Sequence, residues 1–150
     1  MQNDFLTPYK EDSGIPLYLP FPRFLIPLDL SNDAKVLYAL LFDRAGISRE
    51  NGYIEPDGRI RLYFTLEEAK GKLNRSRQVA TRAFQELERS GLIIRKKQGL
   101  GRPAVITLNT LPFGKERDVI ALSRRFKQTF PKSETGNCRA CGKAFQKWRF

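Results

Sequence analysis

The polar side of a predicted helix just after residue 76 carries the side chains whose chemistry is most informative. Placed at 100° steps, that side presents amides, a threonine and arginines but no acid, namely Gln78, Thr81, Arg82, Gln85 and Arg89, with Arg77 at its edge. Amide and guanidinium groups can hydrogen-bond base edges and phosphate oxygens in a DNA major groove. An ordinary solvated helix surface is also polar, so this face alone does not separate the two interpretations.

The boundaries of this helix follow from its end residues. The Ser76 hydroxyl can accept from free N–H groups of the first turn, so we expect it to be the N-cap. Gly91 can adopt the left-handed conformation that ends a helix. The opposite side of the helix is apolar at helical spacing, with Val79, Ala80, Ala83, Phe84 and Leu87.

A basic hairpin is predicted directly after this helix. Leu92–Lys97 and Ala104–Leu108 have strand composition, and a loop containing Gly99 and Gly101 joins them. Four basic residues surround its tip: Arg95, Lys96, Lys97 and Arg102. A helix followed by such a hairpin resembles the recognition helix and wing of a winged helix-turn-helix, in which lysine and arginine neutralise phosphates. Arg102 is placed to enter a minor groove.

The residues before position 76 complete the helix-turn-helix. Thr65 and Glu68 form a capping-box pattern that opens a short helix over residues 66–72, and residues 73–75 form the turn. In such a unit the second helix enters the major groove. Thr65, Asn74 and Arg75 are therefore expected near phosphates. Upstream, we expect a helix from the N-cap Ser31 to about Arg44, and a small hairpin formed by residues 53–64.

The chain begins with two segments that are not predicted to form regular structure. Residues 1–14 are polar and are expected to be flexible. Residues 15–30 are apolar but contain four prolines between Ile15 and Leu28, which argue against a helix or a central strand. We expect an extended arm whose Tyr18, Phe21, Phe24 and Leu25 are buried, either on its own domain or on a second subunit.

Charge is distributed unevenly along the chain. The net charge is +11, yet residues 1–73 carry −2, residues 74–110 carry +6 and residues 111–150 carry +7. A basic region that begins at the predicted recognition helix favours nucleic acid over a lipid surface as the partner. The chain has no apolar run long enough to span a bilayer and no signal peptide, so we expect a soluble, cytoplasmic protein.

The C-terminal part, residues 111–150, is predicted to hold a basic amphipathic helix over residues 116–130 and a tail with one CxxC pair. Cys138 and Cys141 are candidate zinc ligands, but a zinc site needs about four ligands and the chain has no histidine. The pair is half of a site completed elsewhere, a redox pair, or two ordinary thiols. No cofactor is expected, with zinc as the open alternative.

With these residues in place, the chain resembles the N-terminal domain of RepA-type plasmid replication initiators. The resemblance rests on four successive blocks: LSNDAKVLYALLFDRAGIS, NGYIEPDGRIRLYF, TLEEAKGKLNRSRQVATRAFQELERSGLI and RKKQGLGRPAVITL. It implies an α+β winged-helix domain that dimerises, binds repeated double-stranded sites in an origin without chemistry, and assembles host replication proteins. It places Ser76, Arg77, Gln78, Thr81 and Arg82 on the recognition helix, and Lys96, Lys97, Arg102 and the 99–103 tip on the wing.

The chain departs from that family in one respect. Such initiators continue into a separate C-terminal domain, whereas about 40 residues follow Leu108 here. The sequence therefore fits either a shortened chain or a short relative that binds DNA without recruiting partners.

The sequence also bears on three other functions. A winged-helix transcriptional regulator of a plasmid or phage would make much the same DNA contacts. A nuclease or relaxase would need clustered acids, or a tyrosine with a histidine metal site, and the acids here are scattered while histidine is absent, so no enzyme is expected. A wing that binds only protein fits the +6 of residues 74–110 poorly.

Overall fold

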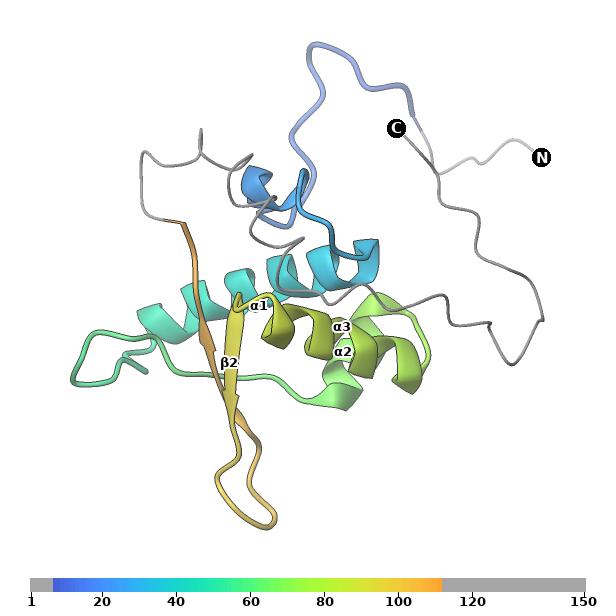
Figure 1. The fold of residues 1–150 in the computed structure, drawn as a ribbon. Coiled ribbons are helices and arrows are strands. Elements are labelled where there is room, and N and C mark those ends of the chain that lie inside the picture. Colours follow the sequence, from blue (N-terminus) through green and yellow to red (C-terminus); the bar gives the residue numbers. More distant parts are fainter. Residues whose placement is uncertain (1–6, 112–150) are drawn as a thin grey trace, which may run out of the picture.

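The computed structural model describes residues 7–111. Its helices are the short 3-10 helix η1 (Arg23–Leu25), α1 (Asn32–Glu50), α2 (Leu66–Leu73) and α3 (Arg77–Arg89). Its strands are β1 (Leu62–Tyr63), β2 (Ile93–Lys96) and β3 (Val105–Leu108). Figure 1 shows the three α-helices packed together, with the β2–β3 hairpin projecting beyond them. This is the predicted α+β architecture.

Each α-helix begins at a side-chain cap that the sequence predicts. The hydroxyl of Ser31 accepts from the backbone N–H of Ala34 at 3.2 Å, and that of Ser76 accepts from Val79 at 3.4 Å. Thr65 and Glu68 form the reciprocal capping box at the start of α2. Gly91, with φ +76°, lies just beyond α3, as expected for a helix end.

The sheet is small, antiparallel and ordered β1–β3–β2. β2 and β3 pair from Ile93 with Leu108 to Lys96 with Val105, and these pairs define the register of the hairpin. β1 pairs with the other edge of β3, with Leu62 opposite Ile106. β3 lies between β1 and β2, so it connects the region before α2 to the hairpin that follows α3.

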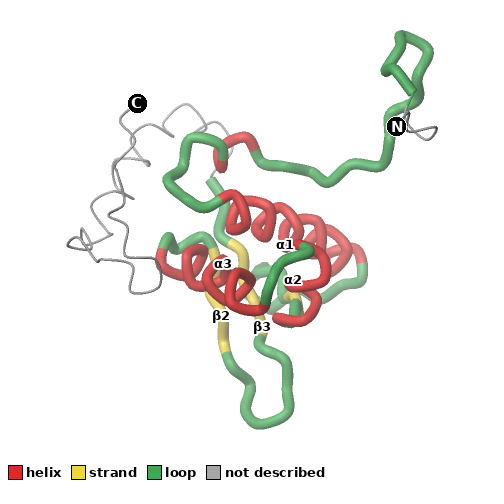
Figure 2. The backbone as a smooth tube through the Cα atoms, turned by 90° about the vertical axis from the view of Figure 1, so that its right-hand side faces the viewer, coloured by secondary structure: helices red, strands yellow, loops and turns green. Residues whose placement is uncertain are grey.

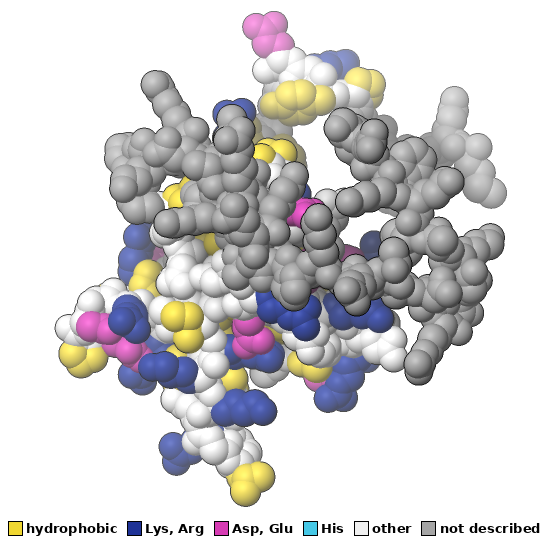
Figure 3. Space-filling view, viewed as in Figure 1, with side chains coloured by type: hydrophobic (Ala, Val, Ile, Leu, Met, Phe, Trp, Pro, Cys, Tyr) yellow, Lys and Arg dark blue, Asp and Glu magenta, His cyan; other side chains and the backbone are white. Residues whose placement is uncertain are grey.

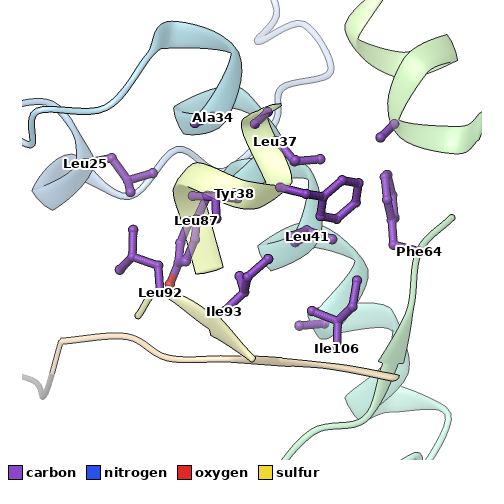
Figure 4. Packing of buried hydrophobic residues seen from close by; sticks show 14 of the residues in the cluster. Leu25, Ala34, Leu37, Tyr38, Leu41, Phe64, Leu87, Leu92, Ile93 and Ile106 are labelled. Atoms are coloured by element: carbon purple, nitrogen blue, oxygen red, sulfur yellow. The ribbon is translucent and has the colours of Figure 1, made fainter. Parts of the chain in front are cut away.

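One core joins every layer of the domain. Figure 4 shows Leu37, Tyr38 and Leu41 of α1 facing Leu87 of α3, with Ile93 and Ile106 of the sheet below them. Leu37, Tyr38, Leu41, Leu87 and Ile106 are fully buried. Burial of this apolar surface is the main stabilising contribution and fixes α3 against α1.

The structure corrects the predicted arm. Residues 15–30 are not extended throughout, because η1 forms one turn at Arg23–Leu25. A single 3-10 turn can begin directly after Pro22, since proline lacks only the N–H that the first turn leaves free. Phe24 and Leu25 are buried in this domain, whereas Tyr18 is 78% exposed and Phe21 is 40% exposed. The arm therefore packs on its own domain through its second half.

Two further boundaries differ from prediction. α1 continues past Arg44 to Glu50, because Ala45 and Ser48 extend its buried side and Gly46 does not end it. Helical spacing in the sequence also predicts Val36 on the buried side of α1, but its side chain is 39% exposed. The predicted 53–64 hairpin forms over residues 53–61, with a bridge between Ile54 and Ile60 and the N–H groups of Glu55 and Arg61 donating to Arg59 and Tyr53, whereas Leu62 and Tyr63 pair with β3.

The N-terminal arm leaves the helices in a different direction from the β2–β3 hairpin. Figure 2 shows the first described residues running away from the three helices, while the hairpin loop extends from the other side. Within residues 7–111, no helix is long and apolar enough to cross a membrane.

Candidate nucleic-acid interface

The turn between α2 and α3 is set by one residue with a left-handed backbone. Asn74 closes α2 with φ +51°, and its N–H donates to the carbonyl oxygens of Lys70 and Gly71. Asparagine tolerates this conformation better than most residues with a side chain. The chain then reverses over Arg75 and Ser76, and α3 starts with its first turn exposed. The predicted helix-turn-helix is therefore present.

The first two turns of α3 form a shallow polar hollow. Arg77, Gln78, Thr81 and Arg82 line it, and all but Thr81 are well exposed. The Thr81 hydroxyl donates to the carbonyl oxygen of Arg77 at 2.8 Å, which orients that side chain along the helix. Gln85 and Arg89 continue the exposed face toward the end of α3. The side chains predicted to face DNA are thus brought together on one surface.

Acids from neighbouring helices approach two of these arginines. The Nε of Arg75 lies 3.1 Å from Oδ1 of Asp33 on α1, and Nη1 of Arg77 lies 3.7 Å from Oε1 of Glu67 on α2. Both guanidinium groups remain well exposed, at 59% and 72%. These exposed pairs are weak and leave the outward edge of each guanidinium accessible.

The hairpin carries the second group of cations. Lys96, Lys97 and Arg102 are exposed, and none of them pairs with a carboxylate among the described residues. Gly99 and Gly101 have φ of +104° and +78°, a conformation that glycine adopts without strain. Figure 3 shows lysine and arginine side chains on the hairpin and along the lower edge of the helices.

Arg95 differs from the other basic residues of the hairpin. Its guanidinium turns back onto α3, where Nε lies 2.9 Å from Oε1 of Glu88. The same group lies over the ring of Phe84, at 5.0 Å from the ring centroid. The sequence places Arg95 beside the wing tip, but its side chain contacts the recognition helix.

The structure adds residues that the sequence did not single out. Leu100 stands fully exposed at the hairpin tip between the two glycines. Asp33, Glu67 and Glu88 each approach an arginine of the predicted interface. Helical spacing can place Glu88 on the side of α3 nearest the following strand, but the pairing of Asp33 with Arg75 depends on how α1 packs.

The candidate zinc ligands lie outside the described residues. Residues 7–111 hold no group of three or more acid, cysteine or histidine side chains suited to a metal ion. Cys138 and Cys141, the predicted helix at 116–130 and the rest of the basic tail lie beyond that range. A zinc site at the cysteines therefore stays a prediction.

Comparison with known proteins agrees with this arrangement. The family model described as replication initiator protein A (RepA) N-terminus matches residues 17–121. The chain belongs to this family. The match includes the arm from Leu17 onward, the helix-turn-helix and the hairpin, so the family is recognised over the whole described fold.

Solved structures and a curated relative support the assignment. A structure described as the N-terminal domain of a DNA binding protein has a TM-score of 0.57 and 28% identity, covering 77% of this chain and 90% of its own. A Rep–DNA complex gives the same TM-score and identity, covering 77% and 91%. A structure described as MDR initiator has a TM-score of 0.55 and 27% identity, covering 72% and 89%.

The curated relative is much longer than the matching region. A 41 kDa protein of Lactobacillus helveticus is 34% identical over 87 residues, which is 55% of this chain and 25% of that protein. The chain therefore spans about a quarter of the length of this curated relative.

Proposed function

We propose that this chain is the DNA-binding part of a plasmid replication initiator and that it binds repeated double-stranded sites in an origin. The observation that supports this most directly is the hollow of Arg77, Gln78, Thr81 and Arg82 at the start of α3, on a helix followed by a basic hairpin. The family membership and the likeness to a Rep–DNA complex point to the same function.

The geometry suits recognition of bases by α3. A helix of 13 residues is about 20 Å long, so its first two turns can lie in a major groove about 12 Å wide. Arg82 and Gln78 project from those turns and can hydrogen-bond guanine and adenine edges. Thr81 can contact a thymine methyl or a base edge.

Phosphates would be held on both sides of that helix. Thr65 caps α2 and Ser76 caps α3, and backbone N–H groups and the helix dipole favour anions at both helix starts, while Asn74 and Arg75 form the turn between the two helices. Lys96, Lys97 and Arg102 would follow the backbone from the hairpin, with Gly99 and Gly101 allowing a close approach. Such contacts set the register of α3 on the duplex and make binding salt-dependent.

The assembly beyond one domain belongs to the same proposal. Repeated sites imply that several copies bind side by side, and a homodimer gives two recognition helices at a fixed spacing. The exposed first half of the arm, with Leu17 and Tyr18, is available for such a contact. Contacts with host replication proteins in the cytoplasm would follow once the origin is bound. No catalytic step is assigned to the described residues.

The experiment that tests this function is DNA binding by the full chain. Fragments tiled across the plasmid or neighbouring DNA would be titrated at two salt concentrations, and each bound fragment would be footprinted. Protection of phased repeats within an origin supports the proposal. Protection of an operator overlapping a promoter would support a transcriptional regulator, and equal, salt-sensitive binding to every fragment would contradict sequence recognition.

A further inference from the structure

The pleat of β2 places Arg95 on the side of the sheet that faces the helices. Ile93 is 2% exposed and Ile94 is 43% exposed, so the core-facing positions of this strand are odd-numbered. Successive side chains of a strand point to opposite faces. Arg95 therefore shares a face with Ile93 and lies toward α3, whereas Lys96 points away.

Arg95 is held on two sides. Nε and Nη2 lie 2.9 and 3.5 Å from the two oxygens of Glu88, and the flat guanidinium lies over the Phe84 ring at 5.0 Å. The Phe84 ring is itself fixed in the core, with 1% of its surface exposed. The Arg95 side chain is 31% exposed, about half as much as that of Arg75.

These contacts join the two elements of the candidate interface. Phe84 and Glu88 lie one helical turn apart on α3, and Arg95 is paired with Ile106 in the middle of the hairpin ladder. β1 pairs with β3 only at Val105 and Ile106, so residues 97–104 project beyond the three-stranded sheet without a supporting strand. The direction of this projecting loop therefore depends on how the sheet is held against α3, and the Arg95 contacts lie where β2 passes α3.

We propose that Arg95 is a positioning residue that holds the wing at a fixed angle to the recognition helix through Glu88 and Phe84, and does not bind phosphate itself. This rests on the proposed function. The fixed angle lets α3 and the cations of the hairpin meet one DNA duplex together. Lys96, Lys97 and Arg102 supply the phosphate contacts, and Arg95 determines where those contacts fall.

The variant Glu88→Gln of the full chain distinguishes a positioning role of Arg95 from a purely electrostatic effect of charge near the DNA. The change removes a negative charge near the interface, so a purely electrostatic account requires tighter binding to every DNA. The contacts of Arg95 with Glu88 and Phe84, called the clamp below, predict the opposite at the cognate site. The affinity should be roughly fivefold lower, because the ion pair is lost and the cation–π contact is weakened. Glu50→Gln is the matched control, since Glu50 is exposed at the end of α1 and forms no ion pair with a described residue.

Arg95→Lys provides the second comparison. Lysine keeps the charge but lacks the planar fork that contacts both Glu88 oxygens and stacks on Phe84. The clamp predicts that Arg95→Lys and Arg95→Gln weaken cognate binding to the same degree, and that neither changes the salt slope. A direct phosphate contact would leave Arg95→Lys close to wild type, and would lower the slope of Arg95→Gln by about one unit.

A charge swap and a footprint complete the test. Glu88→Arg combined with Arg95→Glu should bind the cognate site more tightly than the summed effects of the two single changes, because the ion pair is restored in reverse, whereas a lost phosphate contact and an added charge would give additive effects. In each single variant, protection on the wing side of the site should weaken more than protection under α3, at unchanged thermal stability of the domain. Tighter binding by Glu88→Gln, or additive effects in the swap, would overturn the clamp. Absence of any sequence preference in the wild-type chain would instead overturn the proposed function.

Discussion

The hydroxyl of Tyr38 donates a hydrogen bond of 2.7 Å to the carbonyl oxygen of Asn109, 71 residues further along the chain. Tyr38 lies in the middle of α1 and is fully buried. Asn109 directly follows β3, and its own side chain donates to the carbonyl oxygen of Gly91 at 2.7 Å. The long helix, the end of α3 and the end of the hairpin are therefore joined by two consecutive hydrogen bonds.

Tyr38→Phe should give a pH-dependent loss of stability. Burial raises the pKa of Tyr38 above its ordinary value of 10.0, while a side-chain hydrogen bond with Thr110 lowers it in part. The protonated phenol is thus favoured in the folded state, so its stabilisation is complete below pH 10 and is lost as the pH rises through the folded pKa. At pH 7 the variant should be about 1 kcal/mol less stable, because the Asn109 carbonyl loses its donor. Urea unfolding of both proteins from pH 7 to 11 should show this difference shrinking above pH 10, and a constant difference would contradict the assignment.

Ser76→Ala should weaken the start of the recognition helix. The hydroxyl of Ser76 accepts from the Val79 N–H, and loss of such a cap costs about 1 kcal/mol. Ser76→Thr keeps an oxygen at this position and is the control. Urea unfolding should separate the two variants. Equal stability of alanine and threonine at this position would mean that the cap does not contribute.

Asn74→Ala should strain the turn between α2 and α3. Asn74 is the only described residue other than glycine with a positive φ, and alanine in that conformation costs about 1 kcal/mol. Asn74→Gly relieves the strain, and its free energy of unfolding should equal that of the wild type within a few tenths of about 1 kcal/mol. Thermal unfolding of the three proteins measures the order, and an alanine variant as stable as the glycine variant would show a turn that readjusts freely.

Leu87→Ala should be the most destabilising of these substitutions. Leu87 of α3 is fully buried against α1 and the sheet, so its truncation leaves a cavity and lowers the free energy of unfolding by about 2–5 kcal/mol. The matched control is Leu100→Ala, since Leu100 is fully exposed at the hairpin tip and should not change the free energy of unfolding. Similar losses in both variants would contradict the assigned core.

The helix-turn-helix could be predicted from sequence because its signals are local. Ser76, Thr65 and Glu68 cap their own helices, and Gly91 ends α3, so a few adjacent residues determine each boundary. The α+β arrangement and the hairpin followed from spacing in the same way. The end of α1 was missed because Ala45 and Ser48 become buried only when the rest of the domain packs against them.

The candidate site was only partly predictable for a related reason. Helical periodicity correctly placed Gln78, Thr81 and Arg82 on one side of α3, with Gln78 and Arg82 exposed and Thr81 half-buried. It could not show that Asp33 approaches Arg75 or that Arg95 turns back to Glu88, since those pairs depend on tertiary packing and strand register. Sequence position identified Arg95 as a basic residue near the wing, whereas the pleat of β2 decided which way it faces.

The central claim is that α3 recognises bases while the hairpin contacts the phosphate backbone. Its most direct test is the ratio of cognate to random DNA affinity for Arg82→Ala and Lys97→Ala across a range of salt concentrations, with Arg23→Ala on η1 as the control. Arg82→Ala should lose about 1–3 kcal/mol on cognate DNA and relax specificity at one or two base pairs. Lys97→Ala should weaken cognate and random binding alike and lower the salt slope by about one unit. If both variants weakened cognate and random DNA equally, with the same change of slope, base recognition by α3 would be contradicted.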